Sequence, residues 1–110
     1  MVNRACSFLV WNVRGLFSSA GSLSKLLDKY DIDFAFLSEH KLKPEYIGVT
    51  NSLHSNYLAH CVCDTSSTVG KAGVCILYKK DCQFSITKLD NIASDRICGI
   101  CIENRISGHC

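Results

Sequence analysis

Two polar side chains in this sequence stand where a metal-assisted reaction could take place. Glu39 follows the apolar run 34–37, and Asn12 closes an earlier apolar run at 7–12. The segment between the two runs has the spacing of a helix, so the order is strand, helix, strand, and a right-handed crossover makes the two strands parallel. Parallel strands bring their carboxyl ends to one edge of the sheet, where ligands bind in open α/β sheets. We therefore expect Asn12 and Glu39 to lie side by side.

Carboxylate and amide oxygens suit a hard divalent cation such as Mg²⁺ or Mn²⁺. Mg²⁺ takes oxygen ligands, keeps several waters and needs only one or two carboxylates from the protein. Asn12 and Glu39 are thus a candidate metal site. The alternative for Glu39 is an ordinary solvated loop residue, because glutamate side chains are mostly exposed.

Other side chains near these two could contact a phosphate group. Arg14 follows Asn12 in the loop after the first strand, where it could contact a phosphate or simply be solvated. His40 could be a phosphate ligand or a general base, or an ordinary loop histidine. Lys41 and Lys43 are expected to be solvated, although at this edge they could also contact a DNA backbone.

The spacing of apolar residues predicts the elements that must position this edge. The run 34–37 predicts a strand buried on both faces. Between the first two strands, three serines offer helix N-caps and four apolar residues follow at helical spacing: Ser18, Ser19 and Ser22, then Leu23, Leu26, Leu27 and Tyr30. A second helix is predicted to start at Pro44, with Leu42, Tyr46, Val49 and Leu53 at helical spacing.

The rest of the chain reads as strands. They are predicted at 57–62, 73–78, 84–89 and 97–102, and a loop rich in serine and threonine is predicted at 64–71. This loop lacks the pattern of a phosphate-binding P-loop. Gly73, after the loop, is expected where backbone segments pack closely.

Eight cysteines leave two further hypotheses open. A disulfide framework would require an oxidising compartment, which the N-terminal sequence does not indicate. Cys61, Cys63, Cys98 and Cys101 could instead supply four thiolates to zinc. In a strand at 97–102, however, positions three apart point to opposite faces, so we expect the cysteines to be mainly small buried apolar residues.

Composition bounds the class of protein. A chain of 110 residues has room for one core and makes a second domain unexpected, and a hydrophobic content of 47% with a single proline argues against disorder. The formal net charge of +2 neither identifies nor excludes a nucleic-acid partner. No apolar run approaches a membrane span and the start lacks a signal-peptide core, so we expect an intracellular location, which includes the nucleus. The sequence does not indicate an oligomeric state.

Four short motifs occur in an order that resembles the start of the endonuclease/exonuclease/phosphatase superfamily. They are WNVRGL at 11–16, DFAFLSEH at 33–40, GKAGVCIL at 70–77 and SDRICGI at 94–100. Within that superfamily, the apurinic-type endonuclease domain of non-LTR retrotransposons looks nearest. The resemblance implies an α/β fold, part of a four-layer α/β sandwich of the DNase I-like type. Residues 1–110 would then be the N-terminal portion of a single domain whose C-terminal half is absent.

The resemblance also implies an activity, the hydrolysis of phosphodiesters with a divalent metal. It assigns Asn12 and Glu39 to the metal site, with Mg²⁺ or Mn²⁺ as the cofactor and DNA as the partner of a complete domain. Two later motifs of the superfamily, Asp-x-Asn and Ser-Asp-His, do not occur, and His109 follows a glycine instead of an aspartate. An incomplete DNA endonuclease is therefore one hypothesis. A catalytically inactive remnant or binding fragment is a second, and a phosphomonoesterase of the same superfamily is a third.

Overall fold

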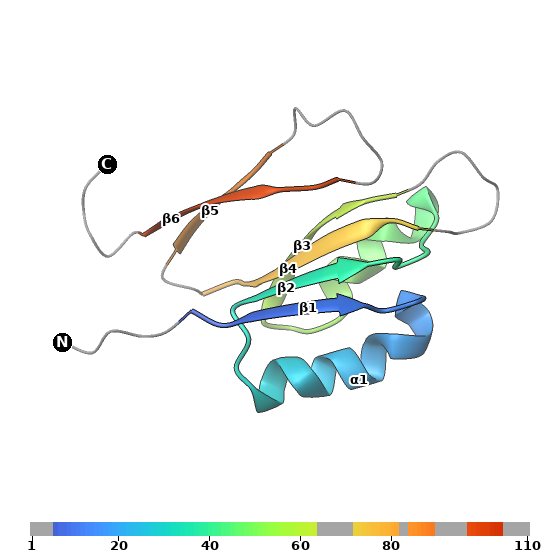
Figure 1. Ribbon diagram of the computed structural model, residues 1–110, viewed down its shortest axis with the longest axis horizontal. Helices are drawn as coiled ribbons and strands as arrows, with labels where there is room; N and C mark the ends of the chain where they lie inside the picture. The colour runs from blue at the N-terminus through green and yellow to red at the C-terminus, as the bar shows by residue number, and fades with distance from the viewer. Residues whose placement is uncertain (1–5, 64–71, 82–83, 90–96, 105–110) are drawn as a thin grey trace.

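A four-stranded sheet with the order β1-β2-β4-β3 forms the centre of the molecule (Figure 1). The computed structural model describes residues 6–63, 72–81, 84–89 and 97–104. The sheet contains β1 (Phe8–Asn12), β2 (Phe34–Ser38), β3 (Tyr57–Val62) and β4 (Val74–Lys79), and a separate pair consists of β5 (Phe84–Lys88) and β6 (Ile100–Asn104). The helical elements are α1 (Leu16–Lys29) and the 3-10 helix η1 (Pro44–Ser52).

The predicted parallel pair is confirmed. β1 and β2 run parallel, with Asn12 opposite Ser38, so the ends of both strands lie at one edge of the sheet. β4 is antiparallel to β2 and to β3. Glu39 consequently follows directly after the residue that Asn12 faces.

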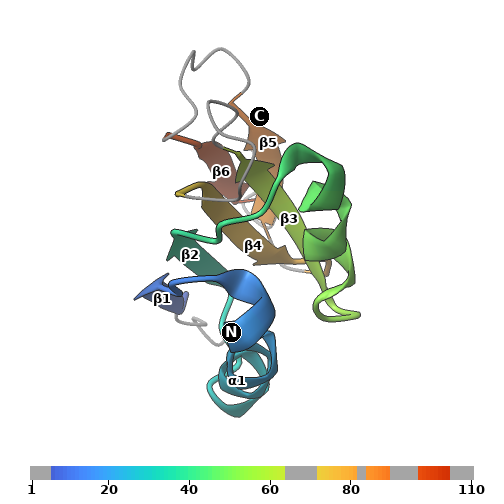
Figure 2. The same cartoon turned by 90° about the vertical axis from the view of Figure 1, so that its right-hand side faces the viewer.

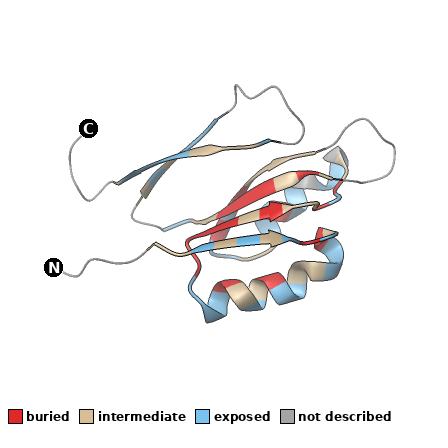
Figure 3. Cartoon of the chain, in the orientation of Figure 1, coloured by how far each residue is buried: buried red, intermediate tan, exposed pale blue. Residues whose placement is uncertain are grey.

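The two faces of the sheet are covered differently. Figure 2 shows α1 and η1 on one face and the β5–β6 pair over the other. The buried core lies between the sheet and the helices, where Figure 3 marks the buried residues of α1, β2 and β4. Its members are apolar residues from α1, from the strands and from the segments that connect them: Val13, Leu16, Leu23, Leu27, Ile32, Ala35, Leu37, Leu42, Tyr57, Ala59, Cys75 and Leu77. Burial at Phe34, Ala35 and Leu37 confirms a strand covered on both faces.

The start of α1 differs from the expectation. The helix begins at Leu16 with Gly15 as its N-cap residue and no capping side chain, so Ser18, Ser19 and Ser22 lie inside it. The hydroxyls of Ser18 and Ser19 donate to the carbonyls of Gly15 and Val13, at 3.1 and 2.7 Å. Leu16 is buried and extends the apolar stripe further toward the N-terminus than predicted, whereas Tyr30 is exposed.

Two further elements differ from the prediction, one in the type of helix and the other in the residue at which it starts. The segment after Pro44 is a 3-10 helix, and Tyr46 and Val49 are exposed on it while Leu42 is buried. The last strand starts at Ile100, later than the predicted 97–102. The predicted loop 64–71 lies outside the described residues. None of the helices in the described ranges is long and apolar enough to cross a membrane.

The described cysteines depart from the expectation of small buried apolar residues, since Cys101 is exposed and two others are paired. Cys61 and Cys75 occupy opposite positions on β3 and β4 and are joined in a disulfide. Cys98 lies with its sulfur 3.9 Å from the His60 carbonyl oxygen, and burial raises the pKa of this thiol. Within the described ranges no three histidine, cysteine or acidic side chains are grouped as metal ligands.

Candidate active site

The candidate site lies where β1 and β2 end. Past their last paired residues, the backbone continues to pair: the Val13 N–H donates to the Ser38 carbonyl at 3.0 Å, and the Gly15 N–H to the Glu39 carbonyl at 2.8 Å. The Leu16 N–H then donates to the His40 carbonyl at 2.9 Å. These bonds attach the first turn of α1 to the loop that carries Glu39.

Asn12 and Glu39 are brought together as predicted. The Asn12 side-chain amide donates to the Glu39 carboxylate, and its carbonyl oxygen accepts the Arg14 backbone N–H at 3.2 Å. Asn12 is exposed and Glu39 is half-buried. The amide thus holds the carboxylate, while the fold leaves the pair accessible from solvent.

Left-handed backbone is concentrated at this edge. Four residues other than glycine have positive φ here: Arg14 at 49°, Glu39 at 55°, Lys41 at 59° and Ala72 at 51°. Such a conformation costs about 1–3 kcal/mol for each residue, and it persists where surrounding contacts impose it. Backbone of this kind is frequent at active sites, and here it turns the loop sharply on both sides of His40.

His40 is an internal residue of the loop. Its side chain is 1% exposed. Its Nδ1 accepts the Leu42 backbone N–H at 2.9 Å, and its Nε2 lies 2.8 Å from the Val62 carbonyl oxygen. Because Nδ1 must accept, Nε2 carries the proton and donates it to that carbonyl. Burial lowers the pKa of His40, against the smaller opposing effect of the bond to Val62.

Both ring nitrogens of His40 are therefore engaged by backbone groups. This geometry argues against the roles of phosphate ligand and general base considered for His40, since either would need a free nitrogen. Arg14 is exposed in the loop after Asn12, where a phosphate could reach it. The alkyl chain of Lys41 lies near Gly15, and Lys41 as a whole is exposed.

Gly73 packs against the His40 ring. A Cβ at Gly73 would overlap the imidazole atoms, and the φ of this glycine is 91°. The close backbone packing expected at Gly73 is confirmed, but the sequence did not indicate His40 as its partner. The participation of the Val62 carbonyl was also missed, because no side-chain pattern marks a backbone acceptor.

A cavity of about 210 Å³ lies beside Glu39 and is lined by Ser38, Glu39, Ala72, Gly73 and Val74. The Glu39 carboxylate at this cavity, with the Asn12 side chain bonded to it, fits Mg²⁺, which needs only one or two carboxylates and keeps several waters. A soft metal would require thiolates or imidazoles, and the only imidazole in this loop, that of His40, is already bonded through both nitrogens.

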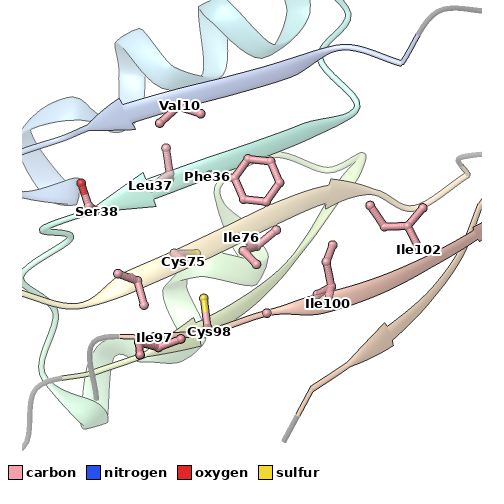
Figure 4. Close-up of a pocket in the computed structure, with 12 residues that line it drawn as sticks. Val10, Phe36, Leu37, Ser38, Cys75, Ile76, Ile97, Cys98, Ile100 and Ile102 are labelled. Atoms are coloured by element: carbon pink, nitrogen blue, oxygen red, sulfur yellow. The ribbon is translucent and has the colours of Figure 1, made fainter. Parts of the chain in front are cut away.

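A larger cavity of about 470 Å³ lies between the main sheet and the β5–β6 pair (Figure 4). Val10, Phe36 and Ile76 line it from the sheet, and Cys98, Ile100 and other apolar residues line it from the opposite side. Ser38 contributes a polar group at its end nearest the Glu39 loop. The rest of the lining is apolar apart from the thiol of Cys98.

The sequence matches no protein-family model and no curated protein. Two solved structures from Neisseria resemble the fold. One is a substituted form of the 3′ phosphatase NExo bound to a product DNA hairpin. Its TM-score is 0.60, with 22% sequence identity, and the match covers 89% of this chain and 38% of that chain. The other is the 3′-5′ exonuclease NExo of Neisseria meningitidis, with a TM-score of 0.57 and 22% identity over 86% of this chain and 37% of that one.

These likenesses establish the class of fold. The chain has a mixed α/β fold of the DNase I-like type, as predicted, and it spans less than two fifths of the length of the two solved structures.

Proposed function

We propose that this chain carries the metal-binding edge of a divalent-metal-dependent phosphoesterase acting on DNA. The observation that supports it most directly is the contact between Asn12 and Glu39 at the shared end of two parallel strands. The DNase I-like fold, found in a Neisseria phosphatase bound to a DNA hairpin and in a Neisseria exonuclease, points to the same chemistry. An endonuclease of the retrotransposon type is the finer form of the proposal.

Each residue has a defined task in this proposal. Glu39 and the Asn12 carbonyl oxygen would hold Mg²⁺ or Mn²⁺, and the Asn12 amide orients the carboxylate. The bound cation would stabilise negative charge on the phosphate. Arg14, exposed beside Asn12, would contact a phosphate of the backbone. No residue is assigned to activate the water, because the motif that would supply it is not found in this sequence.

The first test compares the parent chain with Glu39→Gln. We expect the parent to bind Mn²⁺, measured by the loss of the free-ion paramagnetic resonance signal, and Glu39→Gln to bind it at least about 10-fold more weakly, since a ligating carboxylate is lost. Glu45→Gln, the same change at an exposed acid of η1, is the control and should bind as the parent does. Equal affinity of Glu39→Gln and the parent would refute the metal assignment.

Two activity assays on the same proteins then separate the candidate functions. Mg²⁺-dependent nicking of supercoiled plasmid that is lost in Glu39→Gln would support the endonuclease. Release of phosphate from a 3′-phosphorylated DNA hairpin would support the phosphomonoesterase, which the Neisseria phosphatase makes the leading alternative.

A binding fragment without activity is the second candidate function. It remains a candidate because the likeness in fold covers 38% of the structurally similar phosphatase. Metal-dependent binding of DNA without nicking or phosphate release would support it. A folded parent that neither binds Mn²⁺ nor acts on either substrate would exclude the hydrolase proposal for this chain.

A further inference from the structure

His40 connects the loop that carries Glu39 to three other segments. Its backbone N–H faces the Gly73 carbonyl at 3.4 Å, and its carbonyl accepts the Leu16 N–H at the start of α1. Its ring reaches the Val62 carbonyl at the end of β3, 22 residues further along the chain. Backbone and ring together therefore join α1, β3 and the start of β4.

The two residues that flank His40 have left-handed backbone, as described above for Glu39 and Lys41. Such a loop would relax if nothing held it. The Glu39 carbonyl and the Lys41 N–H are each tied by one backbone bond, to Gly15 and to Ala72, both at 2.8 Å. The imidazole is the only part of this loop from 39 to 41 for which a side-chain bond to β3 is described.

We infer that His40 is a positioning residue, whose buried ring holds the Glu39 loop in the one conformation that turns the carboxylate toward Asn12. The ring acts through the backbone and does not touch substrate or metal. It packs against Gly73, where any side chain would displace it. This inference rests on the proposed function only for its consequence, the affinity of the site for a divalent metal.

A readout without metal tests the positioning itself. The Asn12 side-chain amide donates to Glu39, so its two N–H resonances in a ¹⁵N correlation spectrum report the contact. Glu39→Ala gives the position of these resonances when the contact is absent. We expect His40→Ala to move them most of the way toward that position, and His40→Gln, whose amide can still donate to the Val62 carbonyl, to restore them toward the parent.

His54 provides a matched control. Its Nδ1 also accepts the backbone N–H two residues further on, from Asn56 at 3.1 Å, and its Nε2 lies 2.7 Å from Asp28 at the other end of α1. His54→Ala therefore removes a similar pair of bonds from a histidine away from the site. We expect it to leave the Asn12 resonances unchanged.

The metal readout follows with the same variants. We expect His40→Ala to weaken Mn²⁺ binding by about 10-fold, the size of effect seen when a residue that orients a ligand is removed, and His54→Ala to leave it unchanged. If His40→Ala does not fold, His40→Asn takes its place, because asparagine can still accept the Leu42 N–H but is too short to reach Val62.

The outcomes distinguish the positioning role of His40 from the proposed metal-binding function. Asn12 resonances that stay at the parent position in His40→Ala or His40→Asn, while Glu39→Ala moves them, would overturn the positioning role. Shifted resonances in a parent that binds no Mn²⁺ would support the positioning role and refute the proposed function instead. Equal shifts of the Asn12 resonances in His54→Ala and His40→Ala would show that His40 contributes only to the overall stability of the fold, and would overturn the inference.

Discussion

Single residues decide the geometry of the Glu39 loop. Gly73 has a φ of 91° and leaves space that the His40 ring fills. Gly73 lies directly before β4, which begins at Val74. Its lack of a side chain makes room for the neighbouring loop that carries His40. An imidazole with both nitrogens bonded to backbone can then lie at the base of a loop whose other face reaches solvent.

A methyl group at Gly73 should therefore destabilise the fold. We expect Gly73→Ala to lower the free energy of unfolding by about 2–5 kcal/mol, because alanine disfavours positive φ and its Cβ would overlap the ring. Gly21→Ala is the control, since Gly21 lies in α1 with open space where an alanine methyl group would stand. That change should stabilise the protein by about 0.5–1 kcal/mol, because glycine weakens a helix interior. Urea unfolding of both variants measures the difference, and similar effects of the two would contradict the contact.

At the scale of elements, the β3–β4 pair carries a covalent link in addition to its ladder. Cys61 and Cys75 are 14 residues apart in sequence and face each other across the two strands. The end of β3 also supplies the Val62 carbonyl to His40. Anything that holds β3 to β4 therefore also supports the loop with Glu39.

Reduction of this disulfide should weaken the fold. We expect a reductant to lower the free energy of unfolding by about 3 kcal/mol, the value for closing a loop of this length in the unfolded chain. The double variant Cys61→Ala with Cys75→Ala should not respond to the reductant, and urea unfolding with and without it gives the comparison. An intracellular location, expected from the sequence, would keep the thiols reduced. Peptide mapping of protein isolated without reductant that finds both thiols free would contradict the bond.

At the scale of the whole molecule, the main sheet has one face closed by α1 and η1 and the other covered only in part. The cavity of about 470 Å³ between the sheet and the start of β6 is bordered by Val10, which is 80% exposed on β1. Phe8, on the same face, is also exposed and stacks on the rings of Phe34 and Phe36. An apolar surface of this kind favours association with other apolar groups.

A charge on this face should reduce such association. We expect Val10→Lys to lower the fluorescence of bound anilinonaphthalene sulfonate and to raise the soluble fraction on heating, because a lysine on a sheet surface opposes apolar contacts. Phe17→Lys, at an exposed aromatic residue of α1 outside the cavity, is the control. Equal dye binding by Val10→Lys and the parent would show that this face is not the dye-binding surface.

Sequence alone predicted the parts of this protein that depend on local pattern and on chain order. The apolar runs identified β1 to β4 closely, and β3 (Tyr57–Val62) was predicted with its bounds. The handedness of strand–helix–strand crossovers was enough to place Asn12 beside Glu39. The starts of α1 and β6 were misplaced. The helix begins at Leu16, after Gly15 and without a side-chain cap, and β6 begins at Ile100, with a single further backbone bond from Leu89 to Gly99 before it.

The tertiary structure alone decided the role of His40. Its type and its place after Glu39 indicate a reactive side chain, yet its ring lies inside the loop, bonded to Leu42 and to Val62. The pairing of Cys61 with Cys75 was equally beyond the sequence, since eight cysteines allow many partners. The His40 contacts and the disulfide both depend on which backbone and side-chain groups come into contact when distant segments pack. The local spacing of apolar residues predicts the strands and the helix, but it does not predict these contacts between them.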